Sequence, residues 1–151
     1  MRIFTNRLKE KYESDSVSLA NKTIHDDAAS NSVRFKSDVF TTIKKINGTL
    51  NGVTGSTNEI RMGSIKDGDD IWKKVLYVPE LGYNLDSERQ LVDELGWKKE
   101  TSLDPYVKAY YKYQDGKRIT RRYQRSKGQS HFLMVNVLSV EDNIRKAHSM
   151  Y

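Results

Sequence analysis

The chain has 151 residues, a length that suits one domain with a single core and short flanking segments. Hydrophobic residues make up 36% and charged residues 30%, yet nine Tyr, four Phe and two Trp are too many aromatics for a disordered chain. There is no cysteine, no apolar run near the roughly 18 residues of a membrane span and no signal-peptide core. Disulfides, thiol catalysis and cysteine-ligated zinc are excluded, and the net charge of +6 permits nucleic acid or acidic partners.

The first half of the chain has the pattern of strands. Residues 1–15 are charged with scattered apolar positions, and we interpret them as a leader or a short helix. Alternation of apolar and polar residues then predicts strands at 16–20, 22–25, 43–46, 59–65 and 71–79. The Gly/Thr/Ser-rich stretch 47–58 predicts a mobile hairpin, and 66–70 predicts a turn.

The second half begins with the clearest helix signal, between Ser87 and Gly96. Ser87 can cap the helix, Leu91 and Leu95 share one face, and Gly96 stops it. Further strands are predicted at 107–113, 118–124 and 131–137, with a turn at 115–116, and a new helical pattern starts at residue 140. The coarse prediction is a mainly β fold with one well-signalled helix.

Several kinds of chemistry lack their residues. His25, His131 and His148 are far apart in sequence and have no metal-ligand spacing, and the acidic turn at 66–70 lacks the alternating carboxylates of a calcium loop. No nucleophile-elbow motif is present. The basic segment 117–127 could contact phosphates while its Tyr123 stacks on a base, although charged runs on strands are usually solvated faces.

The informative cluster follows the strand at 22–25 and consists of Asp26, Asp27, Ala28, Ala29 and Ser30. Aspartic peptidases place a carboxylate in a tight turn after a strand, where tiny residues let two such turns approach closely. Two carboxylates then share one proton, because like charges at about 3 Å cannot both ionise. One carboxylate activates a water and the other, protonated, polarises the peptide carbonyl. The alternative interpretation is a helix N-cap or an ordinary turn.

The wider chain resembles the retropepsin-like protease region of copia-type long-terminal-repeat retrotransposon polyproteins. The family turn reads Asp-Ser/Thr-Gly/Ala-Ala-Ser/Thr, to which residues 26–30 are similar, with Phe35 and Phe40 downstream. Residues 75–91, VLYVPELGYNLDSERQL, are similar to the signature VLYVP-x-L-x-YNLLS-x-x-QL. A glycine at 96, a DGK turn at 115–117 and an apolar cluster at 131–135 follow in the family's order, so the resemblance covers roughly residues 16 to 137.

The resemblance implies roles for individual residues. Asp26 corresponds to the catalytic aspartate, and residues 81–87 to the segment that crosses behind the active-site turn. The tail of the chain resembles the approach to the integrase zinc domain, so His148 corresponds to the first ligand of a zinc site that this chain cannot complete. No cofactor is expected. The flap over the substrate corresponds to Asn47, Gly48, Leu50, Asn51, Gly52 and Val53.

Two residues depart from the family pattern. Asp27 stands where a Ser or Thr hydroxyl normally locks the two turns of the dimer together, and its charge would raise neighbouring carboxyl pKa values. Ala28 replaces glycine, a milder change. A register with Asp27 as the catalytic residue is the alternative, but it would put alanine at the hydroxyl position, so we favour Asp26.

The resemblance implies a homodimeric, retropepsin-like closed barrel with one helix and an added β extension. The expected division is a leader at 1–15, a protease domain at 16–100, a C-terminal β extension at 101–138 and a linker at 139–151. The expected function is an aspartic endopeptidase that cleaves its own Gag-Pol polyprotein in cytoplasmic virus-like particles, without a membrane partner. The alternatives are an inactive, domesticated dimerisation module and a small basic β domain that binds nucleic acid.

Overall fold

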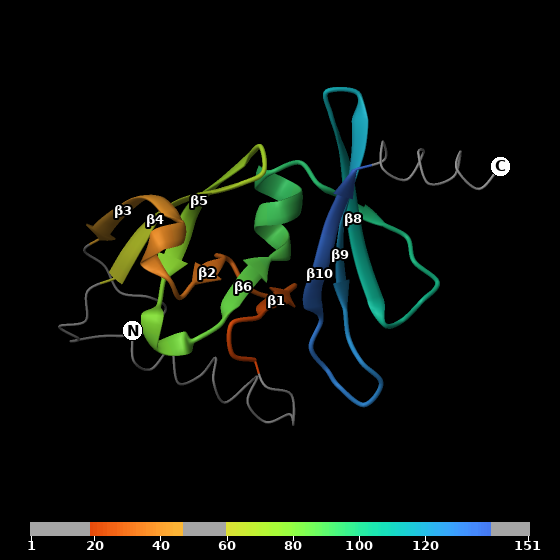
Figure 1. Cartoon of the computed structure of the whole chain (residues 1–151), viewed down its shortest axis with the longest axis horizontal. Coiled ribbons are helices and arrows are strands. Elements are labelled where there is room, and N and C mark those ends of the chain that lie inside the picture. Colours follow the sequence, from red (N-terminus) through yellow and green to blue (C-terminus); the bar gives the residue numbers. More distant parts are fainter. Residues whose placement is uncertain (1–18, 47–59, 140–151) are drawn as a thin grey trace.

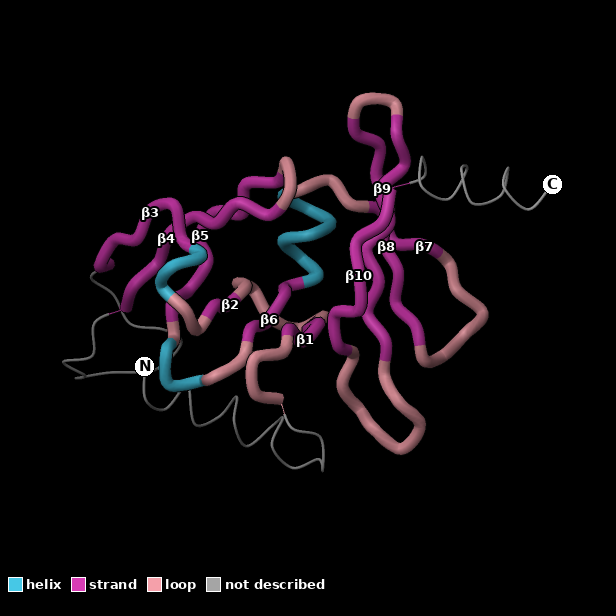
Figure 2. Tube along the Cα trace, viewed as in Figure 1, coloured by secondary structure: helices cyan, strands magenta, loops and turns pink. Residues whose placement is uncertain are grey.

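The computed structural model describes residues 19–46 and 60–139, which form a mainly β structure with one mixed sheet (Figures 1 and 2). Its ten strands are β1 (Thr23–Asp26), β2 (Val33–Arg34), β3 (Phe40–Ile46), β4 (Ile60–Asp67), β5 (Asp70–Tyr77), β6 (Asn84–Ser87), β7 (Lys98–Glu100), β8 (Val107–Gln114), β9 (Lys117–Gln124) and β10 (Leu133–Ser139). The helical elements are η1 (Ser37–Val39), η2 (Pro79–Leu81) and η3 (Gln90–Glu94).

The strand order is β3-β4-β5-β2-β6-β1-β10-β9-β8-β7, with β1 and β6 parallel near the middle. The expected closure into a barrel is wrong for the described residues, because β3 and β7 are open edges of this order. The reason is the pairing of β1 with β10, through which the C-terminal strands extend the sheet instead of closing it. β7 precedes the expected domain boundary at residue 100 and pairs with β8 beyond it.

Most strands predicted from alternation are confirmed, and the three missed strands, β2, β6 and β7, are only two to four residues long. Such short strands carry too few positions for a period of two to be visible. The expected strand at 16–20 lies mostly outside the described residues, as do residues 1–15, the hairpin at 47–58 and the helical pattern from residue 140.

The predicted helix is confirmed in its start and its stop but not in its winding. Residues 88 and 89 are also helical and lead into η3, and the amide N–H of Gln90 donates to Ser87 Oγ at 3.3 Å, so Ser87 caps this helix as expected. Leu95 N–H donates to the Gln90 carbonyl at 2.9 Å, the wide spacing of a π-helix. Gly96 follows with a φ of 79°, a left-handed conformation that ends the helix.

Two clusters of buried residues form the core on either side of β1. The aliphatic cluster contains Leu19, Ile24, Val33, Ile60, Leu76, Val78, Leu81, Tyr83 and Leu85. The aromatic cluster contains Ile65, Trp72, Val75, Leu91, Trp97, Tyr110 and Tyr123. Because side chains alternate along a strand, β1 contributes Ile24 to the first cluster and turns His25 toward the tyrosines of the second.

Candidate functional site

Asp26 is the last residue of β1, where its backbone pairs with Ser87 of β6. It is only 5% exposed, and its Oδ1 accepts a hydrogen bond from the Ala28 N–H at 2.8 Å. Ala29 packs against the aliphatic cluster, while Asp27, Ala28 and Ser30 are exposed. The chain therefore presents a buried carboxylate at the base of a tight turn whose tip is open to solvent.

Hydrogen bonds from β6 and from the start of the helix hold the turn in place. Ser87 Oγ donates to the Ala29 carbonyl at 2.6 Å, and Ser87 N–H donates to Ser32 Oγ at 2.9 Å. Ser32 N–H in turn donates to Gln90 Oε1 at 2.6 Å, and Gln90 Nε2 donates to the Lys73 carbonyl at 2.7 Å. These bonds satisfy the buried polar groups of the turn and fix its backbone.

The sequence predicts Ser87 both as a helix cap and as the last residue of the segment 81–87 that crosses behind the turn, but it singles out neither Ser32 nor Gln90. Ser87 and Gln90 belong to the segment 75–91 that carries the family resemblance, so the signal was present in the sequence. Ser32 carried no separate signal beyond its place six residues after Asp26.

Asp27 points away from this support and its side chain is 63% exposed. Its Oδ2 lies 3.6 Å from Nζ of Lys108 on β8, and the Lys108 ammonium also lies over the Phe132 ring at 4.7 Å from the centroid. An exposed ion pair of this length contributes little to stability, about 1 kcal/mol at most. It does bring the C-terminal strands into contact with the turn.

His25, directly before Asp26, is 5% exposed and faces the C-terminal strands. Its Nε2 lies 2.5 Å from the Tyr110 hydroxyl, which donates to Glu88 Oε1 at 2.5 Å. Burial, reinforced by the nearby Lys108 ammonium, lowers the pKa of His25 to about 4, so the imidazole is neutral at physiological pH. Burial and the Glu88 carboxylate raise the pKa of Tyr110 far above its usual value.

Asp86 lies on β6 and is fully buried. Its oxygens accept from Arg34 Nη2 at 2.7 Å, Arg121 Nη2 at 2.8 Å and the Tyr123 hydroxyl at 2.6 Å. Although burial alone would raise it, the two guanidinium groups hold the pKa of Asp86 well below its usual range. This residue joins the strand behind the turn, β6, to β2 and β9.

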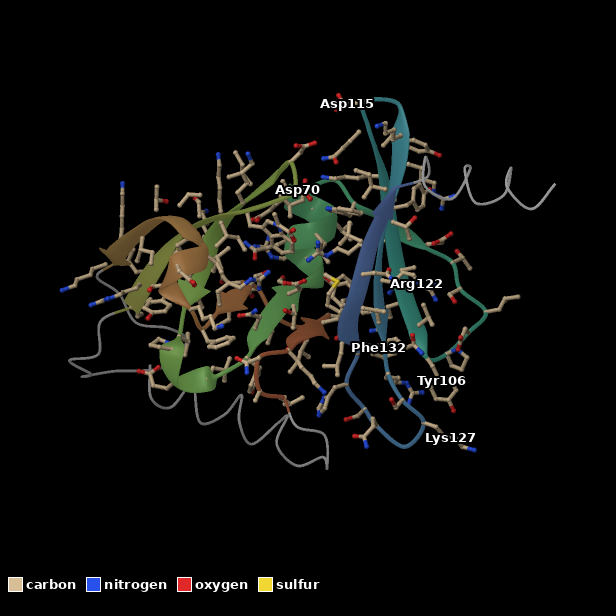
Figure 3. All side chains as sticks on the ribbon, in the orientation of Figure 1. Asp70, Tyr106, Asp115, Arg122, Lys127 and Phe132 are labelled. Carbon is tan, nitrogen blue, oxygen red and sulfur yellow. The ribbon has the colours of Figure 1, made fainter. Side chains whose placement is uncertain are left out.

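The same contacts bury part of the basic segment 117–127. Tyr123 is fully buried and donates to Asp86, so its ring is not available to stack on a base, the possibility that the sequence left open. Arg121 is also buried and pairs with Asp67 and Asp86. Arg122 and Lys127, labelled in Figure 3, remain exposed. Two of the groups that would make this strip a nucleic-acid surface are therefore committed to the core.

Neither a metal site nor a membrane span is visible in the described part of the chain. Across residues 19–46 and 60–139, no three His, Asp or Glu side chains are grouped so that they could hold a metal ion. No helix within those residues is long and apolar enough to cross a membrane.

The structure thus places Asp26, Asp27, Ala28, Ala29 and Ser30 together as one turn. His148 and the expected flap residues, Asn47, Gly48, Leu50, Asn51, Gly52 and Val53, lie outside the described residues. Comparison of the chain with known protein families, with curated proteins and with solved structures finds no match.

Proposed function

We propose that this chain is one half of a retropepsin-like aspartic endopeptidase, of the kind that processes the Gag-Pol polyprotein of copia-type retrotransposons. One observation carries the proposal. A buried carboxylate ends a central strand, accepts the N–H of the residue two positions on, and sits in a turn of small residues with an exposed tip. The family-like segment 75–91 supports it as well, since its Ser87 bonds to the turn and its Gln90 to Ser32 just beyond.

The chemistry requires a second copy of the turn. A single carboxylate can activate water, but it cannot also protonate and polarise the peptide carbonyl. The sequence contains only one such turn, residues 26–30, so one chain supplies a single catalytic aspartate. A two-fold axis through a homodimer would bring two Asp26 side chains together, so that they share one proton. The open tip of the turn is the surface through which such copies would meet.

The geometry favours Asp26 over Asp27 as the catalytic residue. Asp26 is 5% exposed and bonded to the backbone of its own turn, which orients a carboxylate for catalysis. The Asp27 side chain is 63% exposed and is paired with Lys108. A catalytic carboxylate must be held within a fraction of an ångström, and the structure restrains the side chain at position 26 more than the one at position 27.

Cleavage of a mixed peptide library, read by mass spectrometry at pH 5 and pH 7, tests the proposal. The parent chain should cleave, a pepstatin-type inhibitor should block cleavage, and Asp26→Asn should lose it while retaining the fold. Asp69→Asn is the matched control, because Asp69 is an exposed aspartate in the β4–β5 turn. Cleavage that survives Asp26→Asn but is lost in Asp27→Thr would contradict the assignment.

Asp27→Thr also tests the departure from the family pattern. Threonine restores a hydroxyl that can bridge two turns and removes one negative charge from each side of the proposed axis, where repulsion costs on the order of a kilocalorie. We expect a tighter dimer and faster cleavage near neutral pH, measured by sedimentation and by the same assay. A stable dimer in which neither the parent nor Asp27→Thr cleaves would instead support a non-enzymatic dimerisation module.

A further inference from the structure

Strand β8 reaches both neighbours of Asp26. Lys108 and Tyr110 are two residues apart on this strand, so their side chains share one face. Tyr110 meets His25 at 2.5 Å and Lys108 meets Asp27 at 3.6 Å. The residues on either side of Asp26 are therefore each contacted by a polar group from a strand more than 80 positions later in the chain.

The protons of the His25 contact can be assigned. Tyr110 keeps its proton at all ordinary pH values and donates it to Glu88. A hydroxyl with one proton must then accept from its other neighbour, so neutral His25 carries its hydrogen on Nε2 and donates it to Tyr110. Lys99 Nζ lies 3.2 Å from Glu88 and ends the chain of contacts at the surface.

We propose that Tyr110 is a positioning residue for Asp26, acting through His25. This inference rests on the proposed function, because it assigns to the C-terminal strands a part in the active site. The backbone N–H of His25 also donates to the Phe132 carbonyl before β10, at 2.9 Å. The segment that carries Asp26 is thus fixed by β6 and the helix behind it and by β8–β10 on its other side.

The contact between His25 and Tyr110 should depend on pH. The charged groups that act on His25 are Lys108 from β8, Asp86 and Glu88 from β6 and the helical turn after it, and Asp27 from its own turn. When His25 takes up a proton, the positive charge meets the Lys108 ammonium, and its second N–H competes for acceptors. The contact with Tyr110 is therefore arranged for the neutral imidazole, above about pH 4.

Kinetics of Tyr110→Phe in the full chain test the proposal. This variant should lower kcat about 10- to 100-fold with KM within about twofold, since a small misplacement of a catalytic group costs turnover. The matched control is Tyr113→Phe, an exposed tyrosine on the same strand, which should match the parent. Glu88→Met, at a half-buried position, serves as the second variant if Tyr110→Phe does not fold. Parent-like kcat in folded Tyr110→Phe would overturn the proposal.

Nitrogen NMR of the His25 ring separates this inference from the proposed function. The parent should show the Nε2–H tautomer alone, and Tyr110→Phe should show a mixture of tautomers or lose it. Lys108→Met should raise the His25 pKa toward 6.5. An Nδ1–H tautomer in the parent would overturn the chain of contacts even if the protein cleaves peptides. A parent with the expected tautomer but no cleavage would overturn the proposed function, and with it the positioning role, while leaving the contacts themselves established.

Discussion

The two core clusters on either side of β1 differ in the residue types that form them. The aliphatic cluster is made of Leu, Ile and Val with one tyrosine. The aromatic cluster encloses charged groups: the guanidinium carbons of Arg34 and Arg121 lie 5.6 and 5.3 Å from the Trp72 ring centroid, and both pair with Asp86. The first cluster needs only shape and apolar area, while the second also needs every charge to keep its partner.

The largest effect is expected where the aromatic side loses its central charge. Asp86→Asn keeps the shape but leaves buried Arg34 without its counter-charge and buried Arg121 with Asp67 alone, and we expect a loss of about 3–5 kcal/mol in the free energy of unfolding. Urea unfolding at pH 7 measures it. Asp104→Asn, at an exposed position, should change stability by less than about 0.5 kcal/mol. A loss below about 1 kcal/mol for Asp86→Asn would mean that the Asp86 ion pairs do not stabilise the aromatic cluster.

The next effect is a pH dependence that only the aromatic side should show. His25 has an ordinary pKa of 6.5 and a folded pKa of about 4, so the unfolded chain binds the proton first as pH falls. Stability should therefore fall between pH 6.5 and pH 4, by up to about 3 kcal/mol, with no further contribution from His25 below that range. The lowered pKa values of Asp86 and Glu88 take effect only below about pH 4.5.

His25→Gln isolates that dependence, because a glutamine amide can still donate to Tyr110 but does not titrate. Thermal unfolding as a function of pH should show a flatter slope between pH 6.5 and pH 4.5 in this variant than in the parent. Equal slopes in the two proteins would assign the acid sensitivity to other groups.

The smallest effect is expected on the aliphatic side. Ile24 is fully buried, and Ile24→Val removes one methylene, which costs about 0.5–1.5 kcal/mol. The loss should be the same at pH 7 and at pH 5, since no Asp, Glu or His side chain belongs to this cluster. A loss that grows at the lower pH would show that the two clusters are coupled through β1.

The same contrast explains how much of the fold could be predicted from the sequence. Alternation revealed long strands such as β4, β5, β8 and β9, because an apolar residue at every second position marks a strand with one buried face. It could not reveal that β10 pairs with β1, at Ile24 and Leu133, since register between distant strands is set in three dimensions. The prediction of a closed barrel is wrong because it did not include this pairing.

The candidate site divides in a similar way. Adjacent residues alone predict Asp26 and its turn as the candidate site, and the structure shows that Asp26 is buried and accepts from the Ala28 N–H. His25 was considered only as a metal ligand, because its partners Tyr110 and Glu88 are separated from it by 85 and 63 positions. Tyr123 was assigned to the surface for the converse reason: its neighbours in sequence are basic, while its neighbours in space are Asp86 and Arg121.

The central claim is that each chain supplies one Asp26 to a shared active site, and inhibitor stoichiometry tests it most directly. Titration calorimetry of the full chain with a statine-containing peptide should give one inhibitor bound per two chains, and Asp26→Asn should abolish this binding without changing the thermal unfolding curve appreciably. One inhibitor per chain, or binding that survives Asp26→Asn, would contradict the account.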